Sequence, residues 1–407
     1  MYITRIMEKT VEKLSQMFGA VLVTGARQVG KTTLLKTAAS GVRYVTLDDP
    51  VMLQSADEES GTFFKNNPPP VFVDEIQYAP QLFRHIKILL GVQRKMGQFY
   101  LSGSQQFRMM KNVGESLAGR LGIANLSGVS LRETAGSVFS RPFLPTEGYF
   151  RKRVESAAAV SYNEIWDIIH RGGMPELCAN PEFDRQMFYG AYVKTYIERD
   201  VRELTQVGDA IKFMRFMTVT AANTGQLLNL SSLARDVGVS APTAERWLSV
   251  LSASGLVYLL QPYHNNIIKR AVKTPKLYFL DTGLAAYLTR WTTPDVIRNG
   301  AMAGAFFESF AVSEIVKSYY NAGILEPPLF FYRDKDKKEI DLLIEDGGVL
   351  YPIEIKKHAD PKKSDVEAFG ILDKIPSVKR GGGGVICMYG NLAALKGNDM
   401  VIPAGLL

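Results

Sequence analysis

The chain is poor in cysteine and has no long apolar run. Its two cysteines, Cys178 and Cys387, are too few and too far apart in 407 residues for a disulfide framework or a zinc site. This usage fits a reducing cytoplasm, which is the location that we expect. No stretch approaches the roughly 20 apolar residues of a membrane-spanning helix, so we expect no membrane partner. The acids Glu8 and Glu12 predict that the first residues are not a secretion signal.

Charge and composition narrow the function only slightly. The net charge of +7 weakly favours an anionic partner, and it decides nothing alone. The apolar content of 46% and the charged content of 22% are those of an ordinary globular chain. At 407 residues we expect two or three domains, each large enough for its own core.

A glycine-rich loop, GARQVGKT, occupies residues 25–32, directly after the apolar run 20–23 and before a predicted helix. The N–H groups of such a loop and the following helix N-terminus bind a polyphosphate. Its lysine reaches the β and γ phosphates, and the next hydroxyl takes a place on Mg²⁺. The sequence therefore predicts ATP and Mg²⁺ as ligands. The residues that we assign to the nucleotide are Gly25, Ala26, Arg27, Gln28, Val29, Gly30, Lys31, Thr32 and Thr33.

Two acids follow the apolar strand predicted at residues 71–73. Asp74 would join Thr32 in holding Mg²⁺, and Glu75 would polarise the attacking water. A kinase-like phosphate-loop protein does not require the second acid, so Glu75 favours ATP hydrolysis. Another strand, at 99–101, leads to Ser102 and Ser104, either of which could position this water or sense the γ-phosphate.

The sequence leaves two interpretations of Arg120 open. It could project toward the γ-phosphate bound by a neighbouring subunit of a homo-oligomer and act as an arginine finger. It could equally form a surface ion pair.

The pattern along the chain predicts several domains. Residues 1–150 alternate strands and amphipathic helices, as in a parallel α/β sheet, with an entry helix at 7–18. Residues 151–225 are predicted to form a helical lid with helices at 162–171, 183–203 and 211–223.

Residues 226–290 have the pattern of a winged helix. We expect Ser231 or Ser232 to cap a helix at 233–237, and Pro242 to begin a second helix that buries Ala244, Leu248 and Leu251. The stretch 261–280 adds the basic residue Lys276 and no acid. This unit could bind DNA, or it could serve only for packing between domains or subunits. The residues that we assign to DNA are Thr243, Arg246, Lys269, Arg270 and Lys273.

Residues 291–407 hold a second group of chemical side chains. Strand-like runs at 338–344 and 349–356 flank a two-residue turn at Gly347 and Gly348. This turn places Asp341 opposite Glu354, with Lys356 on the same face. Carboxylates in cross-strand register repel, so a cation is expected between them. Because Lys356 alone cannot neutralise the acids, we expect a divalent metal.

An acid on one strand and E-x-K on the next resembles the PD-(D/E)xK nuclease superfamily. The resemblance implies a restriction-endonuclease-like α/β fold in which Glu308, Asp341 and Glu354 bind Mg²⁺. It also implies that Glu354 and Lys356 take part in catalysis, with the lysine positioning or activating water. The alternative is a nuclease-like domain that no longer cuts and serves for binding or assembly.

The whole chain resembles a family of bacterial and archaeal AAA-type ATPases with a C-terminal domain of unknown function. The motifs that carry the resemblance are GARQVGKTTLL, VFVDEIQ, LSGSQQF, SLAGR, RGGMPE, YIERDV and LYFLDTGL. The resemblance implies a P-loop NTPase fold of the AAA type with ATP binding. For function, a DNA-processing ATPase with a nuclease remains beside two alternatives, an ATP-dependent regulatory switch and a protein-remodelling ATPase.

Overall fold

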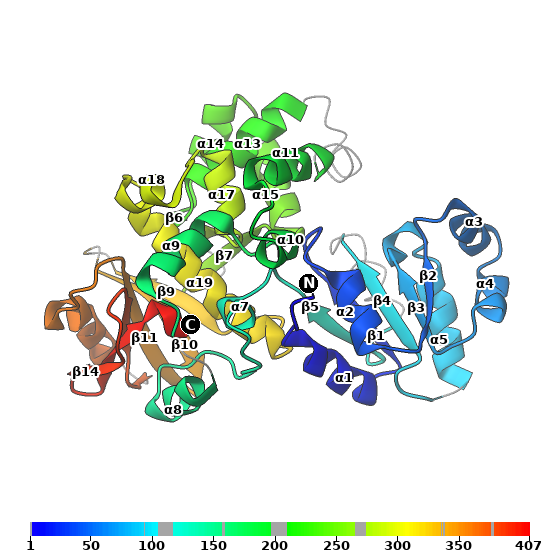
Figure 1. The fold of residues 1–407 in the computed structure, drawn as a ribbon, viewed down its shortest axis with the longest axis horizontal. Helices are drawn as coiled ribbons and strands as arrows, with labels where there is room; N and C mark the ends of the chain where they lie inside the picture. Colours follow the sequence, from blue (N-terminus) through cyan, green and yellow to red (C-terminus); the bar gives the residue numbers. More distant parts are fainter. Residues whose placement is uncertain are drawn as a thin grey trace.

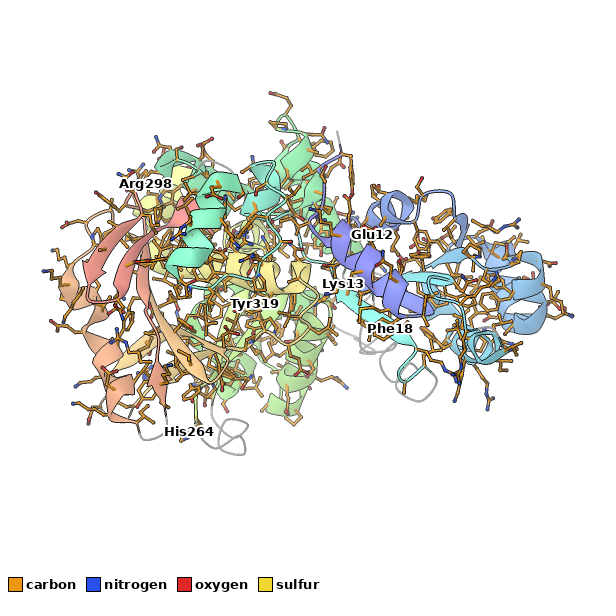
Figure 2. The ribbon with its side chains drawn as sticks, turned by 90° about the horizontal axis from the view of Figure 1, so that it is seen from below. Glu12, Lys13, Phe18, His264, Arg298 and Tyr319 are labelled. Carbon is orange, nitrogen blue, oxygen red and sulfur yellow. The ribbon has the colours of Figure 1, made fainter. Side chains whose placement is uncertain are left out.

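The computed structural model describes residues 2–92, 94–104, 117–156, 159–196, 210–264, 274–334, 336, 338–375 and 378–407. Figure 1 shows an N-terminal lobe, formed by the described residues up to Asn125, beside a larger second lobe in which helices lie above a long sheet. The helix α19 (Ala303–Asn321) runs between the two lobes and contacts strands of both sheets. Figure 2 shows Tyr319 of this helix near the middle of the molecule, where its hydroxyl donates to the carbonyl of Phe143 at 3.0 Å.

The N-terminal lobe is built on five parallel strands in the order β2-β3-β4-β1-β5. The strands are β1 (Ala20–Thr24), β2 (Arg43–Thr46), β3 (Val71–Asp74), β4 (Phe99–Gly103) and β5 (Leu121–Asn125). Because β1, β3 and β4 are buried on both faces, their sequences are nearly continuous apolar runs. The parallel α/β sheet predicted for this part of the chain is confirmed.

Helices cover both faces of this sheet. Val21 and Val23 pack with α1 (Met7–Met17) and α2 (Lys31–Ala38), whereas Ala20 and Leu22 face the opposite core. The period of two along β1 thus separates two helix layers. The opposite layer contains α3 (Pro50–Glu58), α4 (Ser60–Asn66) and α5 (Leu82–Val92).

The second lobe begins with a series of helices. They are α7 (Leu131–Thr134), α8 (Glu147–Ser156), α9 (Tyr162–Arg171), α10 (Pro175–Ala179), α11 (Arg185–Tyr196), α13 (Ala210–Ala222), α14 (Leu230–Val237), α15 (Ala241–Ala253), α17 (Thr282–Leu288) and α18 (Pro294–Asn299). The expected cap of α14 is wrong: Asn229, not Ser231 or Ser232, accepts from the N–H of Ser232 at 2.9 Å. The helix starts earlier than predicted because asparagine is a strong N-cap and precedes both serines.

Strands on both sides of the predicted boundary at residue 290 share the second sheet. Its order is β14-β15-β13-β11-β10-β9-β7-β8-β6, and β12 also pairs with β11. The junction is the parallel pairing of Gln261 with Phe330 and of Pro262 with Phe331. The strands are β6 (Gln226–Leu227), β7 (Val257–Pro262), β8 (Lys276–Phe279), β9 (Leu329–Arg333), β10 (Glu339–Asp346), β11 (Val349–Lys356), β12 (Lys379–Arg380), β13 (Gly384–Cys387), β14 (Ala393–Lys396) and β15 (Asp399–Pro403).

The hairpin of β10 and β11 has the expected register. Asp346 pairs with Val349 across Gly347 and Gly348, whose φ values are 58° and 77°. Positive φ at both central residues of a two-residue turn matches the right-handed twist of the strands and favours glycine.

Within the part of the chain that the structure describes, no helix has the length and apolarity needed to cross a membrane.

Candidate functional site

The glycine-rich loop connects β1 to α2 at the carboxyl edge of the first sheet, where open α/β sheets bind ligands. Gly25 has φ 142°, and a Cβ atom there would collide with the carbonyl oxygen of Leu126. Gly30 adopts a left-handed conformation as the residue before α2. Both positions therefore require glycine for the loop to keep this path.

Lys31 lies inside this loop. Its side chain is buried, and Nζ donates to the carbonyls of Gly25 at 3.1 Å and Ala26 at 2.7 Å. The backbone thereby holds the ammonium at the opening of α2, where loop N–H groups and the helix N-terminus favour an anion.

Asp74, at the end of β3, is the centre of a hydrogen-bonded cluster. It accepts from Thr32 Oγ1 at 2.9 Å, from the Tyr44 hydroxyl at 3.0 Å and from Ser102 Oγ. Burial, together with the charge of Asp74, raises the pKa of Tyr44 to about 12, so this hydroxyl keeps its proton at neutral pH. The pair of Thr32 and Asp74 has the oxygen donors that Mg²⁺ prefers.

Glu75 and Ser104 lie on the open side of the loop. Glu75 has a left-handed backbone, φ 58°, and its carboxylate accepts from Gln77 Nε2. The same amide nitrogen lies 3.5 Å from Ser104 Oγ. Ser102, by contrast, touches Asp74, so the two serines have different neighbours.

A cavity of about 590 Å³ extends from the loop to the helices of the second lobe. One wall is formed by loop residues together with Glu75 and Ser104. The opposite wall comes from α10 and α11, through Pro175, Glu176, Phe188, Tyr192 and Thr195. The helical region predicted as a lid thus forms part of this pocket.

Arg120 lies away from the pocket of its own chain. It directly precedes β5, whose first residue, Leu121, pairs with Ala20 at the start of β1. The loop follows the far end of β1, so Arg120 is at the opposite edge of the sheet. Its guanidinium donates from Nη1 to the carbonyl of Lys87 at 2.9 Å.

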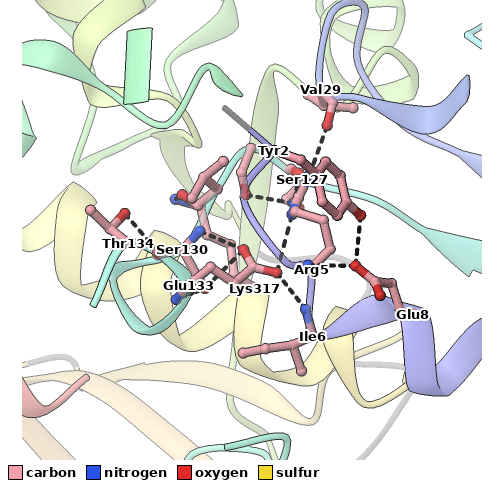
Figure 3. Close-up of polar contacts among 12 residues, drawn as sticks. Tyr2, Arg5, Ile6, Glu8, Val29, Ser127, Ser130, Glu133, Thr134 and Lys317 are labelled. Carbon is pink, nitrogen blue, oxygen red and sulfur yellow. Dashed lines mark hydrogen bonds and ion pairs between the residues drawn. The ribbon is translucent and has the colours of Figure 1, made fainter. Parts of the chain in front are cut away.

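A buried arginine, Arg5, which no sequence motif identifies, supports the loop from behind (Figure 3). Arg5 donates from Nη1 to the carbonyl of Val29 at 2.8 Å and from Nε to Glu133 at 3.1 Å. Its Nη2 donates to the carbonyl of Ser127 at 2.7 Å. The only available signal was one arginine within the apolar segment YITRIM at residues 2–7.

Two motifs that carried no assigned chemistry meet beside this network. The carboxylate of Asp281, in LYFLDTGL, accepts from the N–H of Gly173 at 2.9 Å and from the Tyr189 hydroxyl at 2.8 Å. Gly173, in RGGMPE, accepts from the N–H of Val129 at 2.6 Å. The motifs therefore join α9, α11 and α17 to the segment that follows β5.

The second group of side chains lies on β8, α19, β10 and β11. Lys356 donates to Glu354 Oε2 at 2.6 Å and lies 3.5 Å from Asp341 Oδ2. Asp341 Oδ2 also accepts from the N–H of Ile355 at 2.9 Å. The register that pairs Leu342 with Ile353 brings these two acids beside each other, as the hairpin pattern predicted.

Lys276 is a second cation in this group. Its Nζ lies 3.1 Å from Glu308 Oε1, 2.5 Å from Glu339 Oε1 and 3.9 Å from Asp341 Oδ1. The sequence pattern assigns Lys276 to the basic stretch 261–280 of the predicted winged helix. The structure instead buries it beside the acids, because β8 continues the sheet that carries them and Lys276 is only 4% exposed. We refer to Lys276, Glu308, Glu339, Asp341, Glu354 and Lys356 as the acid cluster.

The pKa values in the acid cluster reflect burial and mutual repulsion. Burial and the charge of Asp341 raise the pKa of Glu354 to about 9. They also raise the pKa of Glu308, against the opposing effect of Lys276. Burial alone would lower the pKa of Lys276, but the carboxylates of Glu308, Asp341 and Glu339 raise it above its ordinary value. Lys276 therefore stays charged.

The donor set of the acid cluster fits a divalent cation on one side. Glu354 Oε1 is buried without a hydrogen-bond partner, and such an atom is unfavourable unless something binds it. Oxygen ligands of this kind suit Mg²⁺ or Mn²⁺. In the described ranges, however, no three His, Cys, Asp or Glu side chains are arranged to hold a metal.

The predicted DNA-binding residues are described only in part. Arg246 is exposed on α15, and Thr243 accepts or donates a hydrogen bond with Ser240 at 2.9 Å at the start of this helix. Ala244, Leu248 and Leu251 are buried, as predicted. Lys269, Arg270 and Lys273 lie outside the described residues.

Comparisons with known proteins divide the chain into three parts. Residues 18–135 match an AAA domain, residues 162–295 match a domain of unknown function (DUF8612), and residues 303–407 match another (DUF4143). Uncharacterized proteins of Mycobacterium tuberculosis and Mycobacterium bovis are each 29% identical over 366 residues, covering 87% of this chain and 74% of theirs.

Two solved structures show a partial likeness. A Walker-type ATPase of Pyrococcus abyssi aligns with a TM-score of 0.42 at 13% identity, over 69% of this chain and 94% of that one. A Holliday junction branch migration motor of Thermotoga maritima aligns with a TM-score of 0.29 at 14% identity, over 62% and 86%.

The AAA match covers the five-stranded sheet, the glycine loop and the cluster of Thr32 and Asp74. This part therefore has a P-loop NTPase fold. The chain therefore combines an AAA domain at residues 18–135 with a C-terminal part, residues 303–407, that matches a domain of unknown function (DUF4143).

Proposed function

We propose that this ATPase acts on DNA, and that its acid cluster is a Mg²⁺-dependent nuclease site. The observation that carries the proposal is the convergence of Asp341 and Glu354 on Lys356, beside the second oxygen of Glu354, Oε1, which is buried without a partner. Two carboxylates and a lysine on adjacent strands are suited to phosphodiester hydrolysis.

In the nucleotide pocket, Lys31 would bind the β and γ phosphates, and Thr32 with Asp74 would hold Mg²⁺. Glu75 would orient the attacking water, with Gln77 holding its carboxylate. Ser104 lies within reach of the same amide and would contact the γ-phosphate. The loop residues Ala26 to Thr33 would surround the phosphates, and α10 and α11 would close the pocket.

In the acid cluster, Asp341 and Glu354 would hold the cation. A bound divalent cation lowers the pKa of a water molecule and makes it a nucleophile near neutral pH. Lys356 lies 2.6 Å from Glu354 and is 35% exposed, so it can also contact a phosphate at the mouth of the site. Glu308 keeps Lys276 and the Tyr278 hydroxyl in place beside Asp341.

DNA would be bound by exposed residues of α15 and by the basic segment that follows β7. Arg246 points to solvent at a position suited to a base edge. Lys269, Arg270 and Lys273, with Thr243, would contact phosphates. Arg120, at the edge of the first sheet, would serve a neighbouring subunit in a homo-oligomer.

A cleavage assay tests the proposal. Full-length protein with Mg²⁺ is incubated with supercoiled plasmid and with linear DNA. Cleavage should require Mg²⁺ and disappear in Glu354→Ala and in the isosteric Glu354→Gln. The exposed acid Glu367, changed to alanine, is the matched control and should leave cleavage unchanged.

One observation favours a second function. Lys276 already forms ion pairs with Glu308 and Glu339, as in a site that binds a partner rather than a metal. In this alternative, ATP binding switches an inactive nuclease-like domain between partner-binding states or drives remodelling of a protein. Unchanged DNA in the assay, with ATP-dependent binding of a protein partner, would favour it.

A further inference from the structure

The acid cluster has two ends that share Asp341. At one end, Lys356 lies 3.5 Å from Asp341 Oδ2 and donates to Glu354. At the other end, Lys276 lies 3.9 Å from Asp341 Oδ1 and contacts Glu308 and Glu339. The two oxygens of one carboxylate therefore face two different cationic groups.

At the Lys276 end, the acids already have protein partners. Glu308 Oε1 accepts from Lys276 and, at 2.6 Å, from the Tyr278 hydroxyl. Glu339 contacts Lys276 through Oε1 and Arg333 through Oε2, at 3.3 Å. A metal ion at this end would have to displace a buried ammonium.

The Glu354 end is incomplete. Glu354 is 5% exposed, and its Oε1 has no hydrogen-bond partner although its Oε2 binds Lys356. An unpaired buried carboxylate oxygen is costly, so this atom binds a proton or a cation. Because the carboxylate of Asp341 is its neighbour across the hairpin, a divalent cation bound here would replace the proton and take both acids as ligands.

We propose that Lys276 takes the place of a second metal ion, so that the acid cluster binds a single divalent cation, Mg²⁺ or Mn²⁺, between Asp341 and Glu354. This inference rests on the proposed nuclease function and specifies its metal content. Glu308 is then a positioning residue that holds Lys276, and it is not a metal ligand.

The charges of the cluster agree with one cation. Its four carboxylates face two ammonium groups and, at the rim, the Arg333 guanidinium. One divalent cation gives the site a small positive charge, which suits a phosphodiester. A second would add two more positive charges in a largely buried pocket, where repulsion is weakly screened.

The test is a Mn²⁺ titration of nucleotide-free, full-length protein, followed by electron paramagnetic resonance of free Mn²⁺. Sites in the cluster are counted as those that Asp341→Asn removes, because Asp341 belongs to both ends of the cluster. We expect one such site in the wild type. The control variant Lys338→Met, which changes an exposed lysine directly before β10, should also have one. Lys276→Met frees Glu308, Glu339 and Asp341 oxygens, so we expect two sites.

A second variant covers the possibility that Lys276→Met does not fold. Glu308→Gln keeps the shape of the side chain and leaves Asp341 and Glu354 intact. We expect its Mn²⁺ stoichiometry to stay at one. The affinity should fall by up to about tenfold to a hundredfold, as for other groups that position a metal site from outside, so the number of sites is the readout.

The outcomes separate this inference from the nuclease proposal. Two Asp341-dependent sites in the wild type, none at all, or loss of the site in Glu308→Gln would overturn the single-cation assignment. Whether DNA is cut is decided independently by the plasmid assay. DNA cleavage by a protein with two such sites would leave the nuclease proposal standing and remove only the role of Lys276.

Discussion

Arg5 donates a hydrogen bond to the carbonyl of Val29 at 2.8 Å, so the N-terminal segment is bonded directly to the phosphate loop. Glu133, the ion-pair partner of Arg5, also accepts from the N–H groups of Ile6 and Ser130, both at 2.8 Å. The next N–H, of Leu131, donates to Glu314 of α19 at 2.7 Å. The loop is thus connected by consecutive polar contacts to the helix that also carries Glu308 (Figure 3).

Loss of the Arg5 side chain should weaken both the fold and the nucleotide site. In Arg5→Met, Glu133 stays buried without its cation, which typically costs about 3 to 5 kcal/mol. We expect a lower melting temperature and weaker ATP binding, measured by differential scanning calorimetry and fluorescence titration. Arg84→Met, on the exposed face of α5, is the control. Wild-type melting of Arg5→Met would show that the network does not stabilise the loop.

Separate variants should divide nucleotide binding from hydrolysis. Lys31→Ala should abolish binding, because it removes the cation held at the opening of α2. Glu75→Gln should bind ATP and lose turnover, because it spares Thr32 and Asp74. Phosphate release and equilibrium binding measure the two steps. Hydrolysis at the wild-type rate in Glu75→Gln would mean that another group activates the water.

Arg120 provides a test of assembly. If Arg120 reaches the nucleotide site of a neighbouring subunit, Arg120→Ala should keep ATP affinity and lose turnover. Arginine fingers in other enzymes increase the rate roughly 10³- to 10⁵-fold. Specific activity should also rise with protein concentration. A monomer whose activity is independent of concentration would leave only the structural role of Arg120, its bond to the Lys87 carbonyl.

The DNA contacts should be separable by their salt dependence. Neutralising Lys269, Arg270 and Lys273 together should weaken binding to every sequence and reduce the slope of log K against log salt by up to about 3. Arg246→Ala should reduce sequence preference with a smaller change in slope. Fluorescence anisotropy at several salt concentrations gives both quantities. An unaltered slope in the triple variant would assign this region to packing.

His170 should make the second lobe sensitive to mild acid. Burial, and then the charge of Arg185, lower the pKa of His170 to about 4. The folded state therefore favours the neutral ring of His170. This ring contributes its full share of stability above pH 6.5, and the contribution is lost as the pH falls toward 4. The loss at pH 5 should be on the order of 1 kcal/mol, which is less than the full shift implies, because the ring is only partly buried and solvent screens its charge.

Melting curves at pH 7.5 and pH 5 measure this effect. His170→Gln should lose less stability between these two values than the wild type, whereas His85→Gln, on α5, should keep the wild-type loss. Equal losses in wild type and His170→Gln would show that other groups control the acid response.

The first sheet and the hairpin of β10 and β11 could be predicted from the sequence, because short runs of neighbouring residues determine them. The apolar run before Gly25 and the carboxylate after β3 predicted the first sheet, and the glycine pair predicted the register of Asp346 with Val349. Lys276 could not be assigned correctly, because its partners Glu308 and Glu339 are 32 and 63 residues away and depend on sheet order. Arg5 was missed for the same reason, since its partner Glu133 is 128 residues away.

The pairing of β7 with β9 has a consequence for how the protein comes apart. Strand β7, which ends at Pro262, pairs with β9, which begins at Leu329. The strands before and after the segment 263–328 therefore belong to one hydrogen-bonded sheet. A fragment of the chain that ends or begins near residue 290 would therefore carry β7 or β9 as an open edge, which readily pairs with other chains. Hydrogen exchange should accordingly protect β7 to β11 with one common free energy of opening, as a single cooperative unit of unfolding.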